Sequence, residues 1–306
     1  MSVTAGGPVA NVGRVLTELG VDLHLTGNIG PDSFGAILER LSYETCGVHH
    51  SLAVVEGTGT SFTIVIQPPG KDRTYWHYAG ANAHFDGTTV DVSKGDLLHL
   101  GYPSSLPALM EQDGRPLKAL MVRARAAEVT TSLDLSYIDP RSWAAGIDWA
   151  SLFADLLPLI DVISPSIDDL SSAFREEHPK TLGGAAAFAR RLVRAGVGVA
   201  MVTAGPAGLV VATAGQKRLR QSRVLTDLAT QSAEQLVAVP ASPTANAQTL
   251  GAGDAATGGL LFGLLAGLDL LTTANCASAA ATQSVQRNNR GSRPSDGQAD
   301  HWRKWR

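Results

Sequence analysis

The clearest candidate for chemistry is a segment rich in small residues late in the chain, residues 248–259, which precedes an apolar run. Glycines before a helix let backbone N–H groups converge on an anion, and the helix dipole favours negative charge at that end. Asp254 falls in the first turn of this expected helix. A loop that holds an oxyanion beside a carboxylate able to accept a proton is suited to phosphoryl transfer to a hydroxyl group.

Two other interpretations of this segment have to be weighed. An acid in the first turn is also a common helix cap, with glycines that only pack the helix onto a sheet. Gly251, Gly253 and Ala256 also satisfy a loose Gly-x-Gly-x-x-Ala dinucleotide fingerprint. That fingerprint should open a βαβ unit, whereas only about 50 residues follow Ala256, and we expect helices and a tail there. We therefore favour the phosphate site over the dinucleotide site and leave the cap open.

The elements that must position this segment alternate between strand and helix along most of the chain. Short apolar runs bounded by glycine predict strands, and apolar residues at helical spacing predict helices. The expected strands cover residues 24–29, 97–100, 130–135, 161–164, 197–203 and 209–212, and the expected helices 9–19, 34–41, 115–127, 152–157, 184–195, 254–266 and 271–287. Because the run 197–203 is almost wholly apolar, it indicates a parallel strand covered on both faces. This pattern predicts one three-layer α/β/α domain over residues 1–306, with a mostly parallel central sheet.

Three parts of the chain depart from the alternation. Residues 52–78 hold three runs rich in β-branched and aromatic residues, so we expect a small antiparallel piece that forms a lid or an oligomer contact. An open sheet edge there could pair with a second copy, which predicts a homodimer through this lid. Residues 214–235 are polar and carry no clear pattern. Residues 288–306 are polar and contain Gly, Ser and Pro, so a C-terminal tail is expected.

Composition excludes several classes of function. The chain has 306 residues, of which 44% are hydrophobic and 17% charged, so it is globular. A net charge of −3 leaves no basic footprint, which argues against nucleic acid as a partner. Cys46 and Cys276 have no ligand-like spacing and are expected to be reduced thiols, as in the cytoplasm. The chain opens without a signal-peptide pattern and holds no apolar run of about 18 residues, so we expect no membrane span.

Motifs of other enzyme classes are missing from the sequence. His49, His50, His77, His84 and His99 show no metal-ligand spacing such as His-x-x-x-His. The chain contains no Gly-x-Ser-x-Gly nucleophile elbow and no Gly-x-x-x-x-Gly-Lys phosphate loop. The residues therefore give no support to a hydrolase or a P-loop enzyme.

With the elements placed, residues 249–254 are similar to the D-T-x-G-A-G-D signature of the PfkB carbohydrate kinases. This family has the ribokinase-like fold and includes ribokinase, fructokinases and adenosine kinase. The resemblance implies an ATP-dependent kinase that phosphorylates a hydroxyl of a small sugar or nucleoside. It implies Asp254 as the general base and the backbone amides of Gly251, Ala252 and Gly253 as the anion hole. It also implies Mg²⁺, with a monovalent cation such as K⁺ as a further candidate ion.

The N-terminal part of the chain carries a second match. Gly6, Gly7 and Asn11, followed by residues 27–35, resemble the family's N-terminal signature. In the family the paired glycines and the asparagine contact sugar hydroxyls, which implies the same role here. The alternative is an N-terminal segment before a helix that starts at Pro8, with Asn11 as an ordinary polar residue.

Two further segments agree with the family in order along the chain. Thr203, Gly205 and Gly208 resemble the T-x-G-x-x-G loop that lies against the nucleotide. Ser166 and Asp169 occupy the place of the N-x-x-E motif, which helps to organise magnesium and phosphates. Alternatives remain for both: a strand end with a turn for the first, and a helix cap with a first-turn acid for the second.

Three departures from the family pattern motivate a second functional hypothesis. Gln248 replaces the acid that opens the signature, and the pair Ser166 and Asp169 replaces Asn and Glu. In the family a first strand, with a sugar-binding aspartate and half of the lid, precedes the paired glycines, whereas five residues precede Gly6 here. The alternative is a ribokinase-fold protein that binds a small ligand or partner without phosphorylating it.

Overall fold

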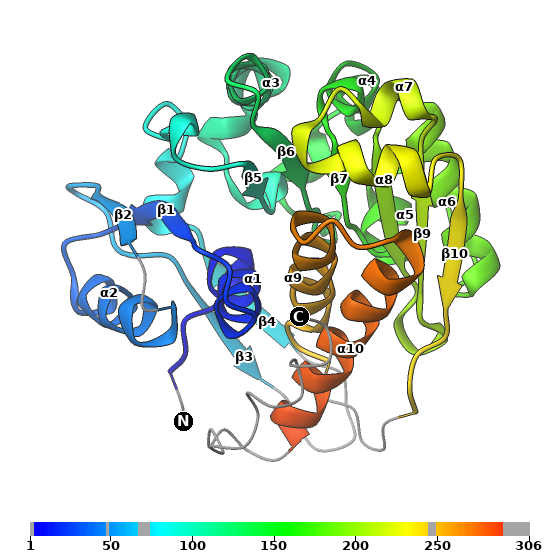
Figure 1. The fold of residues 1–306 in the computed structure, drawn as a ribbon. Coiled ribbons are helices and arrows are strands. Elements are labelled where there is room, and N and C mark those ends of the chain that lie inside the picture. The colour runs from blue at the N-terminus through cyan, green and yellow to red at the C-terminus, as the bar shows by residue number, and fades with distance from the viewer. Residues whose placement is uncertain (1–2, 47–48, 67–73, 244–248, 290–306) are drawn as a thin grey trace.

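The structure is a computed structural model that describes residues 3–46, 49–66, 74–243 and 249–289. Its central element is a six-stranded sheet in the order β10-β9-β8-β7-β6-β5 (Figure 1). The strands are β5 (Leu97–Leu100), β6 (Thr130–Leu133), β7 (Val162–Ile163), β8 (Val199–Thr203), β9 (Leu209–Thr213) and β10 (Leu236–Val239). Strands β5 to β8 pair in parallel, and β9 and β10 are antiparallel additions. The mostly parallel sheet is confirmed.

Two hydrophobic clusters lie on opposite faces of this sheet. Alternate residues of a strand point to opposite faces, and along β8 Ala200 and Val202 belong to one cluster while Val199 and Met201 belong to the other. The first cluster is covered by α3 (Glu111–Ala126), α4 (Trp149–Leu156), α5 (Ile167–Phe174) and α6 (Leu182–Arg194). The second is covered by α1 (Gly7–Glu18), α7 (Gln216–Leu219), α8 (Thr226–Gln231), α9 (Ala252–Leu265) and α10 (Leu270–Asn289). The three layers of the predicted α/β/α architecture are therefore present.

Helix α9 is held tightly between α1 and α10, beside which it lies in Figure 1. All its residues from Asp254 to Leu264 are buried. A Cβ at Gly258 would lie 2.8 Å from the Cβ of Val15 on α1, and one at Gly259 would lie 2.5 Å from the carbonyl oxygen of Cys276 on α10. Glycine is needed at both positions because the neighbouring helices come this close. The start of α9 is consequently fixed by packing along its length.

The segment predicted as an antiparallel lid divides into two parts. Strand β2 (His49–Val54) pairs in parallel with β1 (His24–Ile29), and α2 (Ser33–Cys46) connects them. This corrects the expectation for the first of the three runs, because a strand that returns through a helix runs parallel to the strand before it. Only β3 (Phe62–Ile66) and β4 (Thr74–Tyr78) form an antiparallel ribbon, and every residue in both is exposed.

Some expectations lie partly outside the described residues. The predicted tail begins within α10, and residues 290–306 are not described. Gln248 and the side chain of Cys46 are also outside the description, whereas Cys276 is a buried free thiol. The unassigned residues 214–235 contain α7 and α8, two short helices. In the part of the chain that is described, no helix combines the length and the apolar character that a bilayer crossing needs.

Candidate active site

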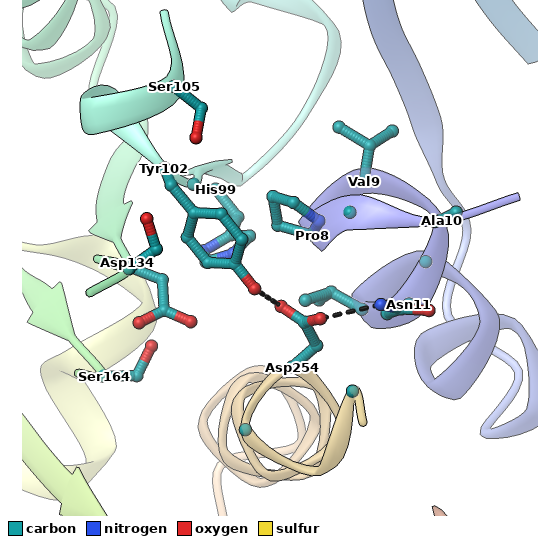
Figure 2. Close-up of a pocket in the computed structure, with 18 of the residues that line it drawn as sticks. Pro8, Val9, Ala10, Asn11, His99, Tyr102, Ser105, Asp134, Ser164 and Asp254 are labelled. Carbon is teal, nitrogen blue, oxygen red and sulfur yellow. Dashed lines mark hydrogen bonds between the residues drawn. The ribbon is translucent and has the colours of Figure 1, made fainter. Parts of the chain in front are cut away.

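The site is built around Asp254, in the first turn of α9. Its N-cap is Gly251, with φ of +71°, and no described side chain caps this end of the helix. Only 4% of Asp254 is exposed. The Nδ2 of Asn11, on α1, donates to its Oδ2 at 2.8 Å, and the Tyr102 hydroxyl, after β5, donates to its Oδ1 (Figure 2). Three distant parts of the chain thus meet at one carboxylate.

Burial dominates the electrostatics of this carboxylate. Desolvation raises the pKa of Asp254, while the hydrogen bonds from Tyr102 and Asn11 and the charge of Arg14 act in the opposite direction. A carboxylate with a raised pKa is a better proton acceptor than a solvated one. Burial, followed by the charge of Asp254, raises the pKa of Tyr102 well above its usual range. The phenol therefore keeps its proton and acts as a donor.

Asp134 is a second buried acid near the site, and the sequence interpretation did not single it out. It follows β6, is 4% exposed, and its Oδ1 accepts from the backbone N–H of Leu135 at 2.8 Å. The Oγ1 of Thr257, on α9, lies 3.4 Å from the Asp134 Oδ2 and 2.9 Å from the Ser164 Oγ. Burial, then the charges of Asp254 and Asp169, raises the pKa of Asp134 well above its usual range. The sequence could have indicated Asp134, because it lies at the carboxyl end of a predicted strand, and ligands bind at the carboxyl ends of parallel strands.

The three amides predicted as the anion hole are not equivalent. The amide of Ala252 donates to the carbonyl of Thr249 at 3.1 Å, so here it serves the turn itself. A Cβ at Gly251 would lie 3.3 Å from the Asn11 Nδ2, whereas one at Gly253 would meet nothing within 4 Å. The open space for an anion is therefore next to Gly253.

The predicted substrate residues lie at the start of α1. Gly6 is the N-cap of this helix, and Gly7 begins it with φ of +74°. A Cβ at either glycine would meet nothing within 4 Å, so both face open space. Pro8 occupies the first turn, as predicted from its missing N–H. Asn11 sits one turn further on, where its amide contacts Asp254.

The predicted nucleotide loop connects β8 to β9. Thr203 ends β8 and forms a parallel bridge with Ser166. Gly205 has φ of +56° and open space around it, which makes its backbone accessible to a ligand. Gly208 has φ of +115°, and a Cβ there would lie 2.1 Å from the carbonyl of Val239, so this glycine is required by the close approach of β10.

Ser166 and Asp169 form a capping box at the start of α5. The Asp169 N–H donates to the Ser166 Oγ at 3.1 Å, and the Ser166 N–H and hydroxyl donate to the Asp169 Oδ2 at 2.8 and 2.6 Å. The cap interpretation of this pair is confirmed. Burial is the main cause that raises the pKa of Asp169 to about 6. Over the described ranges, no group of three or more His, Cys, Asp or Glu side chains is arranged to hold a metal ion.

All the predicted site residues nevertheless line one cleft of about 3100 Å³. They come from the start of α1, the start of α5, the β8–β9 loop and the start of α9. The cleft extends well beyond these residues, as far as Leu265 at the other end of α9 and Arg287 on α10, so only part of its volume belongs to the site.

Comparison with known proteins decides the family. The family model described as pfkB family carbohydrate kinase matches residues 1–296. This chain belongs to that family. The 1-phosphofructokinase of Rhodobacter capsulatus is 26% identical to it over 287 residues, which cover 90% of this chain and 78% of the relative. The resemblance drawn from residues 249–254 is thus confirmed, and the chain is a PfkB-type carbohydrate kinase.

Solved structures confirm the ribokinase-like fold of this PfkB member. The adenosine kinase of Sinorhizobium meliloti has a TM-score of 0.75 at 20% identity, covering 98% of this chain and 83% of that one. The ribokinase of Arabidopsis thaliana, solved in complex with ribose and ATP, has a TM-score of 0.68 at 21% identity, covering 93% and 82%. At such identities the likeness concerns the fold, and the roles of individual residues still have to be argued from the site.

Proposed function

We propose that this kinase transfers the γ-phosphoryl group of ATP to a hydroxyl of a small sugar or nucleoside, with Asp254 as the general base. The observation that carries the proposal is the buried Asp254 at the start of α9, where no described side chain caps the helix. An uncapped helix start attracts anionic oxygens, and the raised pKa of Asp254 suits it to accept a proton. Both features lie in the cleft that the β8–β9 loop also lines.

In this proposal each part of the site has one task. Asp254 takes the proton of the acceptor hydroxyl as its oxygen attacks the γ-phosphorus in line, and ADP leaves. Asn11 holds the carboxylate in place through its 2.8 Å hydrogen bond. The open side of Gly253 and the neighbouring Gly251 receive the transferring group at the helix start. Thr203 and Gly205 border the nucleotide, and Gly208 shapes that loop.

The described residues offer a carboxylate for magnesium, that of Asp169, but no cluster of protein ligands. Mg²⁺ keeps several waters and binds through one or two carboxylates plus substrate phosphates, so it needs no cluster of protein ligands. Asp169 uses its Oδ2 in the capping box with Ser166, and its carboxylate would help to hold the ion. When bound, the ion would neutralise charge on the β- and γ-phosphate oxygens. Ser166 acts only through the cap.

The ligands of related structures support a sugar or nucleoside as the acceptor. The Arabidopsis ribokinase was solved with ribose, and a nucleoside kinase of Burkholderia thailandensis was solved with inosine. Gly6, Gly7 and Asn11 line the same cleft as Asp254, and the two glycines have no side chain to obstruct an acceptor's hydroxyl groups. We therefore assign them to the acceptor side of the cleft.

A panel of sugars and nucleosides with Mg·ATP tests this function through a coupled ADP-release assay. We expect ADP release that depends on at least one acceptor. Calorimetric titration with Mg·ATP runs alongside. Binding of Mg·ATP without turnover on any acceptor would favour the alternative, a ribokinase-fold protein that binds a ligand without phosphorylating it.

The exposed ribbon of β3 and β4 carries the proposal for assembly. We treat residues 1–306 as one domain to which this ribbon adds a lid. Its large apolar side chains include Ile64, Val65 and Trp76, the last 61% exposed. An exposed, apolar two-stranded edge is commonly covered by another chain. We propose a homodimer through the ribbon, which a strict monomer in size-exclusion chromatography at high concentration would contradict.

A further inference from the structure

The base of the proposed reaction is covered in this structure. Asp254 is 4% exposed, and each of its carboxylate oxygens already accepts a hydrogen bond. A general base must lie within hydrogen-bond reach of the proton it removes. Each oxygen keeps a second lone pair, but so little of Asp254 is exposed that an acceptor hydroxyl gains access most directly where one of the two donors moves aside.

Asn11 is the donor whose backbone is held in place by helix packing. It stands on α1, whose Val12, Val15 and Leu16 belong to the hydrophobic cluster shared with α9. The close approach of Val15 to Gly258 shows that these two helices are tightly packed against each other. The backbone of Asn11 is therefore held beside Asp254, and its short side chain keeps the amide near the carboxylate.

Tyr102 is the donor that can leave. It belongs to the segment between β5 and the short 3₁₀ helix Pro103–Ser105, is partly exposed and lines the cleft. Figure 2 shows the Tyr102 ring beside Pro8, with its hydroxyl hydrogen-bonded to the carboxylate of Asp254. Rotation about its side-chain bonds would uncover Asp254 without movement of either helix.

We propose that Tyr102 is a specificity-determining residue that occupies the acceptor-hydroxyl position on Asp254, so that the substrate must displace its phenol. This inference rests on the proposed kinase function. A phenol and an alcohol present the same O–H donor to the same carboxylate. A sugar or nucleoside has further contacts in the cleft that offset the lost phenol bond, whereas a single water has none. Tyr102 thus withholds the base from water and limits hydrolysis of ATP when no acceptor is bound.

The first test is Tyr102→Phe, which keeps the ring and removes the competing hydroxyl. A hydrogen bond to a charged group is strong enough that its removal should lower the acceptor KM by about tenfold, with kcat changed by less than about threefold. Tyr43→Phe, at a tyrosine that is 65% exposed on α2, is the matched control and should change neither. An unchanged KM would overturn the proposal. A fall in kcat would also overturn it and would show that Tyr102 orients Asp254 during turnover.

The second test is Tyr102→Ala, which also removes the ring. ADP release without acceptor should rise severalfold over the wild type, and the double variant Tyr102→Ala, Asp254→Asn should abolish the rise. Acceptor-independent release at the wild-type level in Tyr102→Ala would overturn the proposal. Thermal melts of each variant, compared with the wild type, establish that the fold is retained.

A spectroscopic test separates this inference from the kinase function. With ¹³Cζ-labelled tyrosine, the Tyr102 resonance is assigned by its loss in Tyr102→Phe. Saturation with ribose or inosine should move it toward the resonance of the exposed Tyr43, whether or not phosphate is transferred. A panel without turnover sinks the proposed function alone, whereas a resonance that no compound moves sinks the role of Tyr102.

Discussion

The starts of α9 and α5 place the same residue type in the same position and use it differently. Asp254 and Asp169 both stand in the first turn of a helix that follows the sheet, and burial raises the pKa of both. At α5 the N-cap is Ser166, and Asp169 completes a capping box with it. At α9 the N-cap is Gly251, which has no side chain, and Asp254 bonds to other elements.

The difference shows what frees a first-turn acid for chemistry. A serine N-cap ties the acid to the end of its own helix, because the serine hydroxyl and N–H both donate to it. A glycine N-cap leaves the acid and the helix start open to other groups. Changes of pH, and variants at the two helix starts, can break or sharpen this contrast between Asp254 and Asp169.

The pH dependence of turnover should show the largest effect. Asp254 accepts a proton only when ionised, and its pKa is raised by burial, so kcat should fall about tenfold per unit as the pH drops below that pKa. Because the Asn11 hydrogen bond favours the ionised form, Asn11→Ala should move this limb to higher pH. Kinetics from pH 4 to pH 9 check both statements. The same displacement of the limb in Ser166→Ala would remove the distinction between the two acids.

The two glycines at the start of α9 should separate backbone strain from ligand space. Gly251→Ala places a Cβ at φ of +71°, close to Asn11, and should destabilise the fold by about 1–2 kcal/mol. Gly253→Ala meets nothing within 4 Å, and alanine favours a helix over glycine, so it should not lower stability.

Turnover of the Gly253→Ala variant should nevertheless fall, mainly through a severalfold higher KM for ATP, because its Cβ enters the space assigned to the phosphate. Urea unfolding and steady-state kinetics measure the two effects. An equal loss of stability in both variants would contradict the assignment of the open space to a ligand.

The capping box should show the smallest effect. Ser166→Ala removes the N-cap and should cost about 1 kcal/mol of unfolding free energy, measured in urea. The Mg²⁺ concentration for half-maximal turnover should stay unchanged in this variant and rise in Asp169→Asn, which loses the carboxylate itself. If the Mg²⁺ dependence shifts equally in both variants, Asp169 acts only as a cap.

The sequence was a good guide wherever local chemistry decides the structure. Glycines and apolar periodicity placed α9, the parallel strands and the β8–β9 turn, because these depend on backbone freedom and burial. The capping box was foreseen as the alternative for Ser166 and Asp169, since Ser followed by an acid three positions later is a local pattern.

Contacts between residues far apart in the chain could not be predicted from the sequence. The hydrogen bond from Tyr102 to Asp254 joins residues that are 152 positions apart, and no local pattern encodes it. The parallel pairing of β2 with β1 was missed because β-rich runs were assigned to their nearest neighbours in the chain, whereas the pairing runs across α2. Asp134 was taken as one more strand residue, although it lies just beyond the end of β6.

The central claim is that Asp254 removes the proton from the acceptor hydroxyl. Its most direct test is the kcat of Asp254→Asn, at saturating Mg·ATP and acceptor, with phosphorylated product followed by mass spectrometry. Because the amide has nearly the shape of the carboxylate but cannot accept the proton, the rate should fall by about 10²–10⁴. Formation of the product at the wild-type rate would contradict the claim.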